Sequence, residues 1–139
     1  MVGLVVATHG RLAEELIRTA ERIVGPIERI APVSVDAQSS MDDARARLAA
    51  AIEAVDQGQG VLVLTDMFGG SPANLALTFL ADRIEVVTGV NLPMLLKLAG
   101  SRGDQLAAAA ELAVAQGQKN VQVASALLRG RAQAGGHGP

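Results

Sequence analysis

Short apolar runs alternate along the chain with stretches of helical periodicity. Residues 2–7 form a nearly continuous apolar run, which is typical of a strand buried on both faces of a sheet. The run ends at Thr8-His9-Gly10, and apolar residues then recur at helical spacing over 12–24. Gly25-Pro26 predicts the end of that helix, because glycine suits the left-handed position past a helix end and proline cannot continue the helix.

The rest of the chain repeats this alternation. Further strands are predicted at 27–35, 61–64 and 84–88, and further helices at 41–55, 73–80, 93–98 and 104–115. Pro32 lacks an amide donor, so its strand is predicted at a sheet edge. Ser39 or Ser40 is expected to cap the second helix, and Ser71 the third, with Pro72 at its first position. The pattern of residues 121–127 leaves a last strand and a short helix both open.

Alternating strands and helices predict an α/β fold, a single doubly wound domain whose mostly parallel central sheet carries helices on both faces. In such sheets, ligands bind beyond the carboxyl ends of the strands, near the point where strand order reverses. Three distinctive loops fall at three such ends. They are Thr8-His9-Gly10, the segment from Thr65 to Pro72, and Gly89-Val90-Asn91-Leu92-Pro93.

Composition narrows the classes of function. The 139 residues suit one domain, which we place at residues 1–128, with a tail at 129–139 whose glycine-rich composition predicts disorder. The net charge of −2 provides no basic field for nucleic acid. The absence of cysteine and the presence of only two histidines argue against a metal site. We expect a cytoplasmic protein, since the sequence has neither a signal-peptide pattern nor an apolar stretch that approaches a membrane span.

His9 is the first candidate for chemistry. It is the only histidine before the tail, it ends the first predicted strand, and it immediately precedes a helix. A histidine packed at a strand end is the simpler interpretation. The free amides and partial positive charge of a helix N-terminus, however, suit an incoming phosphoryl group. The position therefore favours a functional His9.

Asp66 is the second candidate. Aspartate at such a position commonly caps a turn, but this one also ends a predicted strand and has Thr65 beside it. If the strands of His9 and Asp66 are adjacent, the carboxylate can accept a hydrogen bond from one ring nitrogen. The other ring nitrogen then stays unprotonated as a nucleophile.

The loop Gly69-Gly70-Ser71-Pro72 is the third candidate. Alone it indicates a tight turn, but beside a phosphorylated histidine it can offer backbone amides and the Ser71 hydroxyl to phosphoryl oxygens. No P-loop lysine motif and no GxGxxG follows a predicted strand, so no nucleotide cofactor is expected. Asn91 and Pro93 are expected to shape the rim, and Arg11 to face either phosphate or solvent. His137 is assigned to the tail.

Together these residues resemble the IIA component of the mannose-type sugar phosphotransferase system. The matching stretches are Ala7-Thr8-His9-Gly10, Asp66 to Pro72 and Gly89 to Leu95, in the expected order and spacing. The resemblance implies that His9 is phosphorylated by the carrier phospho-HPr, that Asp66 supports it, and that Gly10, Gly70 and Ser71 lie near the phosphoryl group. It further implies transfer to a separate IIB protein, with the membrane involved only indirectly through a sugar permease.

The same resemblance implies a homodimer formed by exchange of a C-terminal antiparallel strand, which would be residues 121–127. Two departures stand out: Met67 where some relatives have threonine, and Phe68 where some have tryptophan. Two alternatives stay open. One is a regulatory module whose His9 phosphorylation state selects protein partners, and the other is a receiver-like domain phosphorylated on Asp66.

Overall fold

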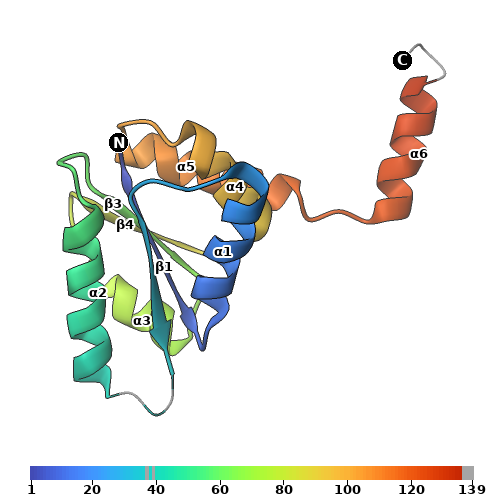
Figure 1. Ribbon diagram of the computed structural model, residues 1–139. Coiled ribbons are helices and arrows are strands. Elements are labelled where there is room, and N and C mark those ends of the chain that lie inside the picture. Colours follow the sequence, from blue (N-terminus) through green and yellow to red (C-terminus); the bar gives the residue numbers. More distant parts are fainter. Residues whose placement is uncertain (37, 39, 136–139) are drawn as a thin grey trace.

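A parallel sheet of four strands forms the centre of the molecule (Figure 1). The computed structural model describes residues 1–36, 38 and 40–135. The strands are β1 (Gly3–His9), β2 (Ile30–Val35), β3 (Val61–Thr65) and β4 (Ile84–Thr88), arranged in the order β2-β1-β3-β4. The chain runs from β1 outward to β2 and then back across to β3 and β4. The predicted doubly wound α/β fold is thus confirmed.

Helices cover both faces of this sheet. They are α1 (Leu12–Val24), α2 (Met41–Val55), α3 (Ser71–Leu77), α4 (Leu92–Ser101) and α5 (Leu106–Lys119), whereas α6 (Ala124–Gly135) does not pack on the sheet (Figure 1). The buried residues of α1, α4 and α5 belong to one core cluster, and those of α2 and α3 belong to a second. The two clusters lie on opposite faces of the sheet, which gives the three layers seen in Figure 1.

Strand β1 explains why the two cores are separate. Leu4 and Val6 belong to the core with α1, whereas Val5 and Ala7 belong to the core with α2. Successive side chains of a strand point to opposite faces, and all four of these side chains are fully buried. The apolar run at the start of the sequence is therefore a central strand, as predicted.

The predicted edge strand is also confirmed. Pro32 lies in β2, opposite Val6 of β1, and β2 is an outer strand of the sheet. Proline has no amide hydrogen to give to a further neighbour, so an outer position suits it. β1 therefore lies inside the sheet, next to β2, and its carboxyl end carries His9.

The N-cap residues of α2 and α3 can be compared with the predicted ones. The Ser40 hydroxyl oxygen accepts a hydrogen bond from the amide of Asp43 at 3.0 Å and caps α2, while Ser39 lies outside the described residues. The prediction that Ser71 caps α3 is wrong by one residue. Gly70 is the N-cap, because its carbonyl already accepts the helical hydrogen bond of the Asn74 amide at 2.9 Å. Ser71 and Pro72 are the first two residues of the helix.

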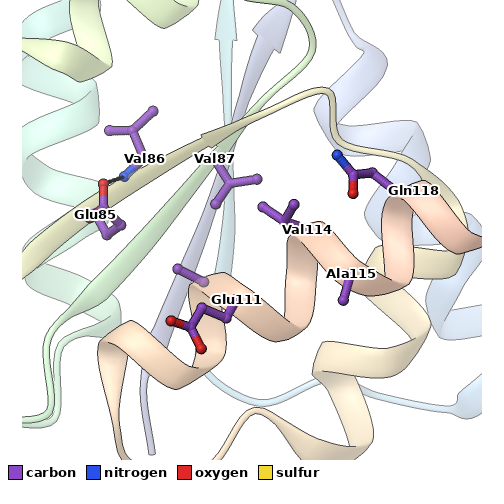
Figure 2. A pocket seen from close by; sticks show the side chains of 8 residues that line it. Glu85, Val86, Val87, Glu111, Val114, Ala115 and Gln118 are labelled. Atoms are coloured by element: carbon purple, nitrogen blue, oxygen red, sulfur yellow. Dashed lines mark hydrogen bonds between the residues drawn. The ribbon is translucent and has the colours of Figure 1, made fainter.

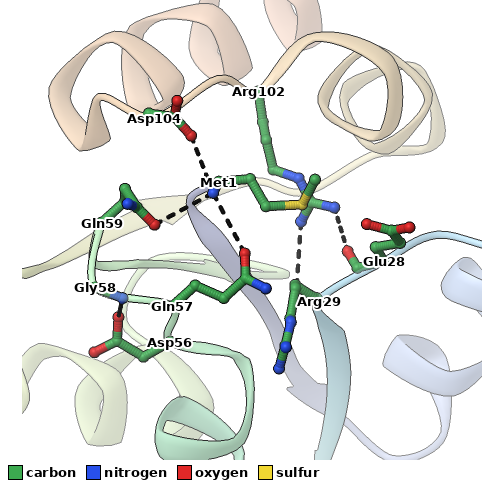
Figure 3. A network of polar contacts seen from close by, with 9 residues as sticks. All are labelled: Met1, Glu28, Arg29, Asp56, Gln57, Gly58, Gln59, Arg102 and Asp104. Atoms are coloured by element: carbon green, nitrogen blue, oxygen red, sulfur yellow. Dashed lines mark hydrogen bonds and ion pairs between the residues drawn. The ribbon is translucent and has the colours of Figure 1, made fainter.

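A polar network joins the loops at the opposite, amino-terminal end of the sheet (Figure 3). The buried guanidinium of Arg102 donates hydrogen bonds to the carbonyl oxygens of Glu28 and Arg29. These bonds tie the end of α4 to the start of β2. This end of the sheet is thus fastened by structural contacts, and the chemistry-bearing loops are at the other end.

The C-terminal segment differs from expectation. Residues 121–123 have no regular secondary structure and α6 begins at Ala124, so the antiparallel strand implied for residues 121–127 is not part of the described chain. Residues 129–135, expected to be disordered, belong to α6, which extends away from the domain in Figure 1. Its alanine, leucine and arginine content favours a helix without help from packing. The rest of the expected tail, including His137, lies outside the described residues.

Candidate functional site

His9 and Asp66 meet at the carboxyl ends of two neighbouring strands. His9 is the last residue of β1, and Asp66 directly follows β3. The two strands pair in parallel, with Ala7 opposite Thr65. Since β1 leads outward to β2 and β3 leads outward to β4, strand order reverses between them, and a parallel α/β sheet forms its binding crevice at this point.

One carboxylate oxygen of Asp66 holds His9 in two ways. The His9 ring nitrogen Nδ1 lies 2.8 Å from Asp66 Oδ2, and the His9 main-chain amide donates to the same oxygen at 3.1 Å. An ionised carboxylate only accepts hydrogen bonds, so Nδ1 carries the hydrogen. The pair therefore fixes the ring orientation and leaves the lone pair on Nε2. The His9 side chain is 48% exposed, whereas that of Asp66 is only 15% exposed.

Opposing effects act on the Asp66 carboxyl group. Its burial raises the pKa, but the hydrogen bonds from the His9 ring and amide and the charge of the ring lower it, and the pKa ends below its ordinary value. The second oxygen, Oδ1, is buried and has no hydrogen-bond partner among the described residues. A buried carboxylate with one unpaired oxygen depends strongly on its remaining partner. The carboxylate is therefore held mainly by its two hydrogen bonds from His9.

Gly70 brings the next loop directly against the imidazole. A Cβ atom placed on Gly70 would lie 2.6 Å from His9 Cε1 and 3.1 Å from Nε2. Real Cβ atoms do not approach other heavy atoms so closely, so a larger residue at this position would displace the ring or the loop. The backbone of the loop therefore packs against the ring edge that carries the free nitrogen. Gly70 was expected from the sequence as a contact to a phosphoryl group, and its packing against the ring has no signal in the sequence.

Thr8 is a site residue that the sequence analysis missed. Its side chain is buried, and its hydroxyl oxygen accepts a hydrogen bond from the amide of Ala13 at 2.7 Å. Arg11, at the N-cap position of α1, makes no such bond. Thr8 thus caps the first turn of α1 from within the strand and fixes the turn that follows His9. A threonine at a strand end five residues before a buried helical alanine is the signal that could have revealed it.

The other expected phosphoryl contacts flank this pair. Gly10 has a φ of 54°, and its amide donates to the carbonyl oxygen of Val35 at 3.2 Å. That amide would have to leave this bond to reach a phosphoryl oxygen. Ser71 is exposed, and its hydroxyl does not cap α3. Arg11 is 73% exposed and its Nε lies 3.4 Å from a carboxylate oxygen of Glu14.

The third loop has a structural role. The Asn91 side-chain oxygen accepts from the amide of Met94 at 3.0 Å and caps α4, while its amide nitrogen donates to the carbonyl of Gly117 at 3.1 Å. Both polar ends of Asn91 are therefore used in joining the loop to α4 and α5. This agrees with the expectation that Asn91 shapes the rim of the site.

The protein is thus a parallel three-layer α/β domain that exposes a carboxylate-oriented histidine at the switch point of its sheet. The family model described as "PTS system fructose IIA component" (EIIA-man) matches residues 3–126. The chain belongs to this family of phosphotransferase-system IIA components, as its motifs predicted.

Individual relatives agree with this assignment. The chain is 34% identical to the mannose-specific EIIAB component of Escherichia coli strain K12 over 105 residues, which cover 74% of the chain and 32% of that protein. It thus spans about a third of the length of that relative. The mannose/sorbose-specific IIA subunit from Enterococcus faecalis superposes with a TM-score of 0.80 at 31% identity, over 88% of this chain and 93% of that one.

A relative of another kind is the transcriptional regulatory protein LevR of Bacillus subtilis. It is 35% identical over 92 residues, which make up 66% of this chain but only 9% of that protein. In the part of the chain that the structure describes, no helix has the length and apolar character needed to cross a membrane.

Proposed function

We propose that this protein is a phosphocarrier that accepts a phosphoryl group on Nε2 of His9 and passes it to a second protein. The observation that supports this most directly is the 2.8 Å contact between His9 Nδ1 and Asp66 Oδ2. It leaves Nε2 with a free lone pair on a half-exposed ring, which is the arrangement of a nucleophile activated by an oriented partner.

The transfer is a displacement at phosphorus. The Nε2 lone pair of His9 forms a bond to the phosphorus atom, and the bond between phosphorus and the donor's nitrogen breaks, with its electron pair returning to the donor. The proton stays on Nδ1, so the phosphorylated ring is a cation. Asp66 stabilises that cation through Oδ2. In the onward step the acceptor's nucleophile attacks the same phosphorus, and the electron pair of the broken bond returns to Nε2.

The phosphoryl oxygens need hydrogen-bond donors at the Nε2 edge of the ring. Gly70 packs against that edge, and Ser71 begins α3 beside it with a hydroxyl that makes no capping bond. We assign the amides of this loop and the Ser71 hydroxyl to the equatorial oxygens of the phosphoryl group. Gly10 contributes the turn at φ 54°, which lets α1 begin immediately after His9.

Membership of this family supports the identity of the proposed donor and acceptor. Phospho-HPr is the proposed donor and a IIB protein the proposed acceptor, since the Escherichia coli relative is named as an EIIAB component of a mannose-specific system. Sugar uptake through a permease would then be the downstream event, and the protein itself would act in the cytoplasm.

Reconstitution tests this proposal. The protein is incubated with labelled phosphoenolpyruvate, enzyme I and HPr, and then with a IIB protein. We expect label on the wild type, no label on His9→Ala, and loss of label from the wild type when the acceptor is added. Equal labelling of wild type and His9→Ala would overturn the proposal.

Similarity to LevR favours a second candidate function, in which the phosphorylation state of His9 selects a regulatory partner. This reading keeps the same acceptor residue and makes onward transfer incidental. A pull-down that compares wild type, His9→Ala and His9→Asp separates the two. Partner capture that follows the His9 variant supports regulation, whereas efficient turnover to a IIB protein supports transport.

The receiver-like alternative is disfavoured by exposure. Asp66 is only 15% exposed and its Oδ2 is occupied by His9, whereas the His9 side chain is 48% exposed. A phosphoryl donor that approaches from solvent therefore reaches the imidazole before it reaches the carboxylate.

We also propose that the protein forms a homodimer. β4 is an outer strand, and a cavity of about 450 Å³ lies between it and α5, lined by Val86, Val87 and Val114 among others (Figure 2). The segment before and within α6 carries exposed apolar side chains, including Val121 at 77% and Val123 at 69%. The same segment of a second copy can cover the outer edge of β4 and this cavity. For that exchange, the segment has to leave the position that it has in the single chain.

A further inference from the structure

Two buried polar atoms of consecutive residues lie beside the candidate nucleophile without a partner. They are the hydroxyl oxygen of Thr65 and Oδ1 of Asp66, and neither has a hydrogen-bond partner among the described residues. Thr65 is fully buried at the end of β3, and Asp66 directly follows it. A hydroxyl group has a hydrogen to donate, whereas an ionised carboxylate oxygen only accepts. The unused hydrogen-bonding capacities of the two neighbours are therefore complementary.

Core packing does not explain the hydroxyl group of Thr65. Val61 and Val63 occupy the preceding alternate positions of β3 and belong to the second core cluster. Valine has the same shape as threonine, and a buried hydroxyl group is unfavourable unless it forms a hydrogen bond. The main chain of Thr65 is already fixed, because its carbonyl oxygen accepts the amides of Gly89 and Val90 at 2.8 and 2.9 Å. The hydroxyl group therefore indicates a hydrogen-bond partner.

The hydroxyl group and the Asp66 carboxylate lie on the same side of the sheet. Ala7 of β1 and Val63 of β3 both belong to the core cluster that includes residues of α3. Alternate side chains of a strand share a face, so His9 and Thr65 also lie on the face that α3 covers. The carboxylate is held to that face, since its Oδ2 lies 2.8 Å from the ring nitrogen Nδ1 of His9.

We propose that Thr65 is a positioning residue for the phosphoryl transfer, and that one enclosed water molecule accepts the hydrogen of its hydroxyl group and donates to Asp66 Oδ1. The inference rests on the proposed function and adds a second support for the carboxylate. Buried waters typically join polar groups that the protein leaves unpaired. A bridging water holds such groups nearly as well as a direct hydrogen bond. With both oxygens bonded, the carboxylate keeps its charge directed at the His9 ring.

This bond has a consequence for the Asp66 carboxyl group. A hydrogen bond donated to a carboxylate favours its charged form and lowers its pKa. Among the described residues, His9 is the only ionisable side chain that shifts the pKa of Asp66, and α3 carries no ionisable side chain. Loss of the bond from Thr65 should therefore appear directly as a higher pKa of Asp66.

Titration of Asp66 followed by ¹³C NMR tests the inference. We expect the pKa of Asp66 to rise by roughly one pH unit in Thr65→Val, which keeps the shape but removes the hydroxyl group. Thr65→Ser restores the hydroxyl group and should restore the wild-type pKa. The matched control is Thr88→Val, at the position of β4 that pairs with Thr65, one strand further from His9. It should leave the pKa of Asp66 unchanged.

Two further measurements complete the test. Labelling of His9 by the small phosphoryl donor phosphoramidate should slow by about tenfold in Thr65→Val and recover in Thr65→Ser. A high-resolution crystal structure of the wild type should show one ordered water within hydrogen-bond distance of both Thr65 Oγ1 and Asp66 Oδ1.

Three results overturn the inference. They are an unchanged pKa of Asp66 in Thr65→Val, an equal rise in Thr65→Ser, which would assign the effect to packing, and a wild-type structure in which no water touches either atom. If the wild type takes no label although the pKa values follow the expected pattern, the proposed function fails while the bond from Thr65 to Asp66 stands. The two failures are thus distinguishable.

Discussion

A single oxygen of Asp66 accepts hydrogen bonds from both the ring nitrogen Nδ1 and the main-chain amide of His9, at 2.8 and 3.1 Å. The second of these bonds does not depend on the ring. It anchors the carboxylate to the end of β1 and so fixes the position of the oxygen that accepts the bond from Nδ1. The orientation of the ring is thereby held by a carboxylate that is itself fixed in place.

Replacement of Asp66 by asparagine tests the charge of this contact. The variant keeps the size of the side chain but removes the negative charge that stabilises the ring after transfer. We expect phosphorylation of His9 to slow by roughly 100-fold. Initial labelling rates with phosphoramidate, a small phosphoryl donor, measure the rate of His9 phosphorylation without any contribution from a protein interface. Circular dichroism checks that the variant is folded. A rate within about twofold of wild type would show that Asp66 has no part in the transfer.

Replacement of Gly70 by alanine tests the packing of the loop against the ring. The new Cβ would lie 2.6 Å from His9 Cε1, so either the ring or the loop has to move. We expect a loss of labelling of about tenfold or more, since small misplacements of reacting groups have large effects on rate. The matched control is Gly100→Ala in α4, where a Cβ meets no atom within 4 Å among the described residues. This control should gain about 0.5–1 kcal/mol in stability and keep full activity. Equal activity of both variants would contradict the packing role.

The ion pair of Asp56 and Arg83 predicts a pH dependence of stability. A hydrogen bond from the Gly58 amide, opposed by burial, together with the charge of Arg83, holds the pKa of Asp56 below its ordinary value of 3.8. A group whose pKa is lowered by folding stabilises the folded state fully above its unfolded pKa, and this stabilisation is lost as the pH falls through the folded pKa. Denaturant unfolding of wild type and Asp56→Asn should therefore give a difference that is constant near neutral pH and shrinks below about pH 4. A difference that stays constant down to pH 2 would contradict the assignment.

The dimer proposal predicts an effect of charge in the groove between β4 and α5. Val114 lines the cavity there and is 39% exposed. Val114→Glu should give a monomer in sedimentation velocity at concentrations where the wild type is a dimer, because a buried unpaired carboxylate opposes association. Ile23→Glu, which places the same charge at another exposed apolar position, should remain dimeric. A monomeric wild type, or a dimeric Val114→Glu, would contradict the proposal.

The sequence predicted the parts of the fold that local rules decide. The apolar run at residues 2–7 indicated a buried strand and Pro32 an edge strand, and both predictions are confirmed. The sequence placed His9 and Asp66 at strand ends on the same edge of a parallel sheet, but it left open whether their strands are neighbours, because strand order depends on tertiary packing. In the structure β1 pairs with β3, which brings His9 to Asp66.

Other features depended on contacts that no local pattern encodes. The approach of Gly70 to the His9 ring is a matter of ångströms between two loops far apart in sequence. The capping of α1 by Thr8 replaces a cap that would ordinarily be sought at Arg11. Residues Ala124–Gly135 form a helix because intrinsic preference, rather than packing against the domain, decides their structure.

The account is tested most directly by locating the phosphoryl group on the protein. Wild type and His9→Ala, both uniformly labelled with ¹⁵N, are phosphorylated and examined by ³¹P and ¹⁵N NMR. We predict a phosphoryl group coupled to Nε2 of His9, stable in base and lost in acid, and no such signal in His9→Ala. A phosphoryl group on Nδ1, a base-labile acyl phosphate on Asp66, or equal incorporation into His9→Ala would contradict it.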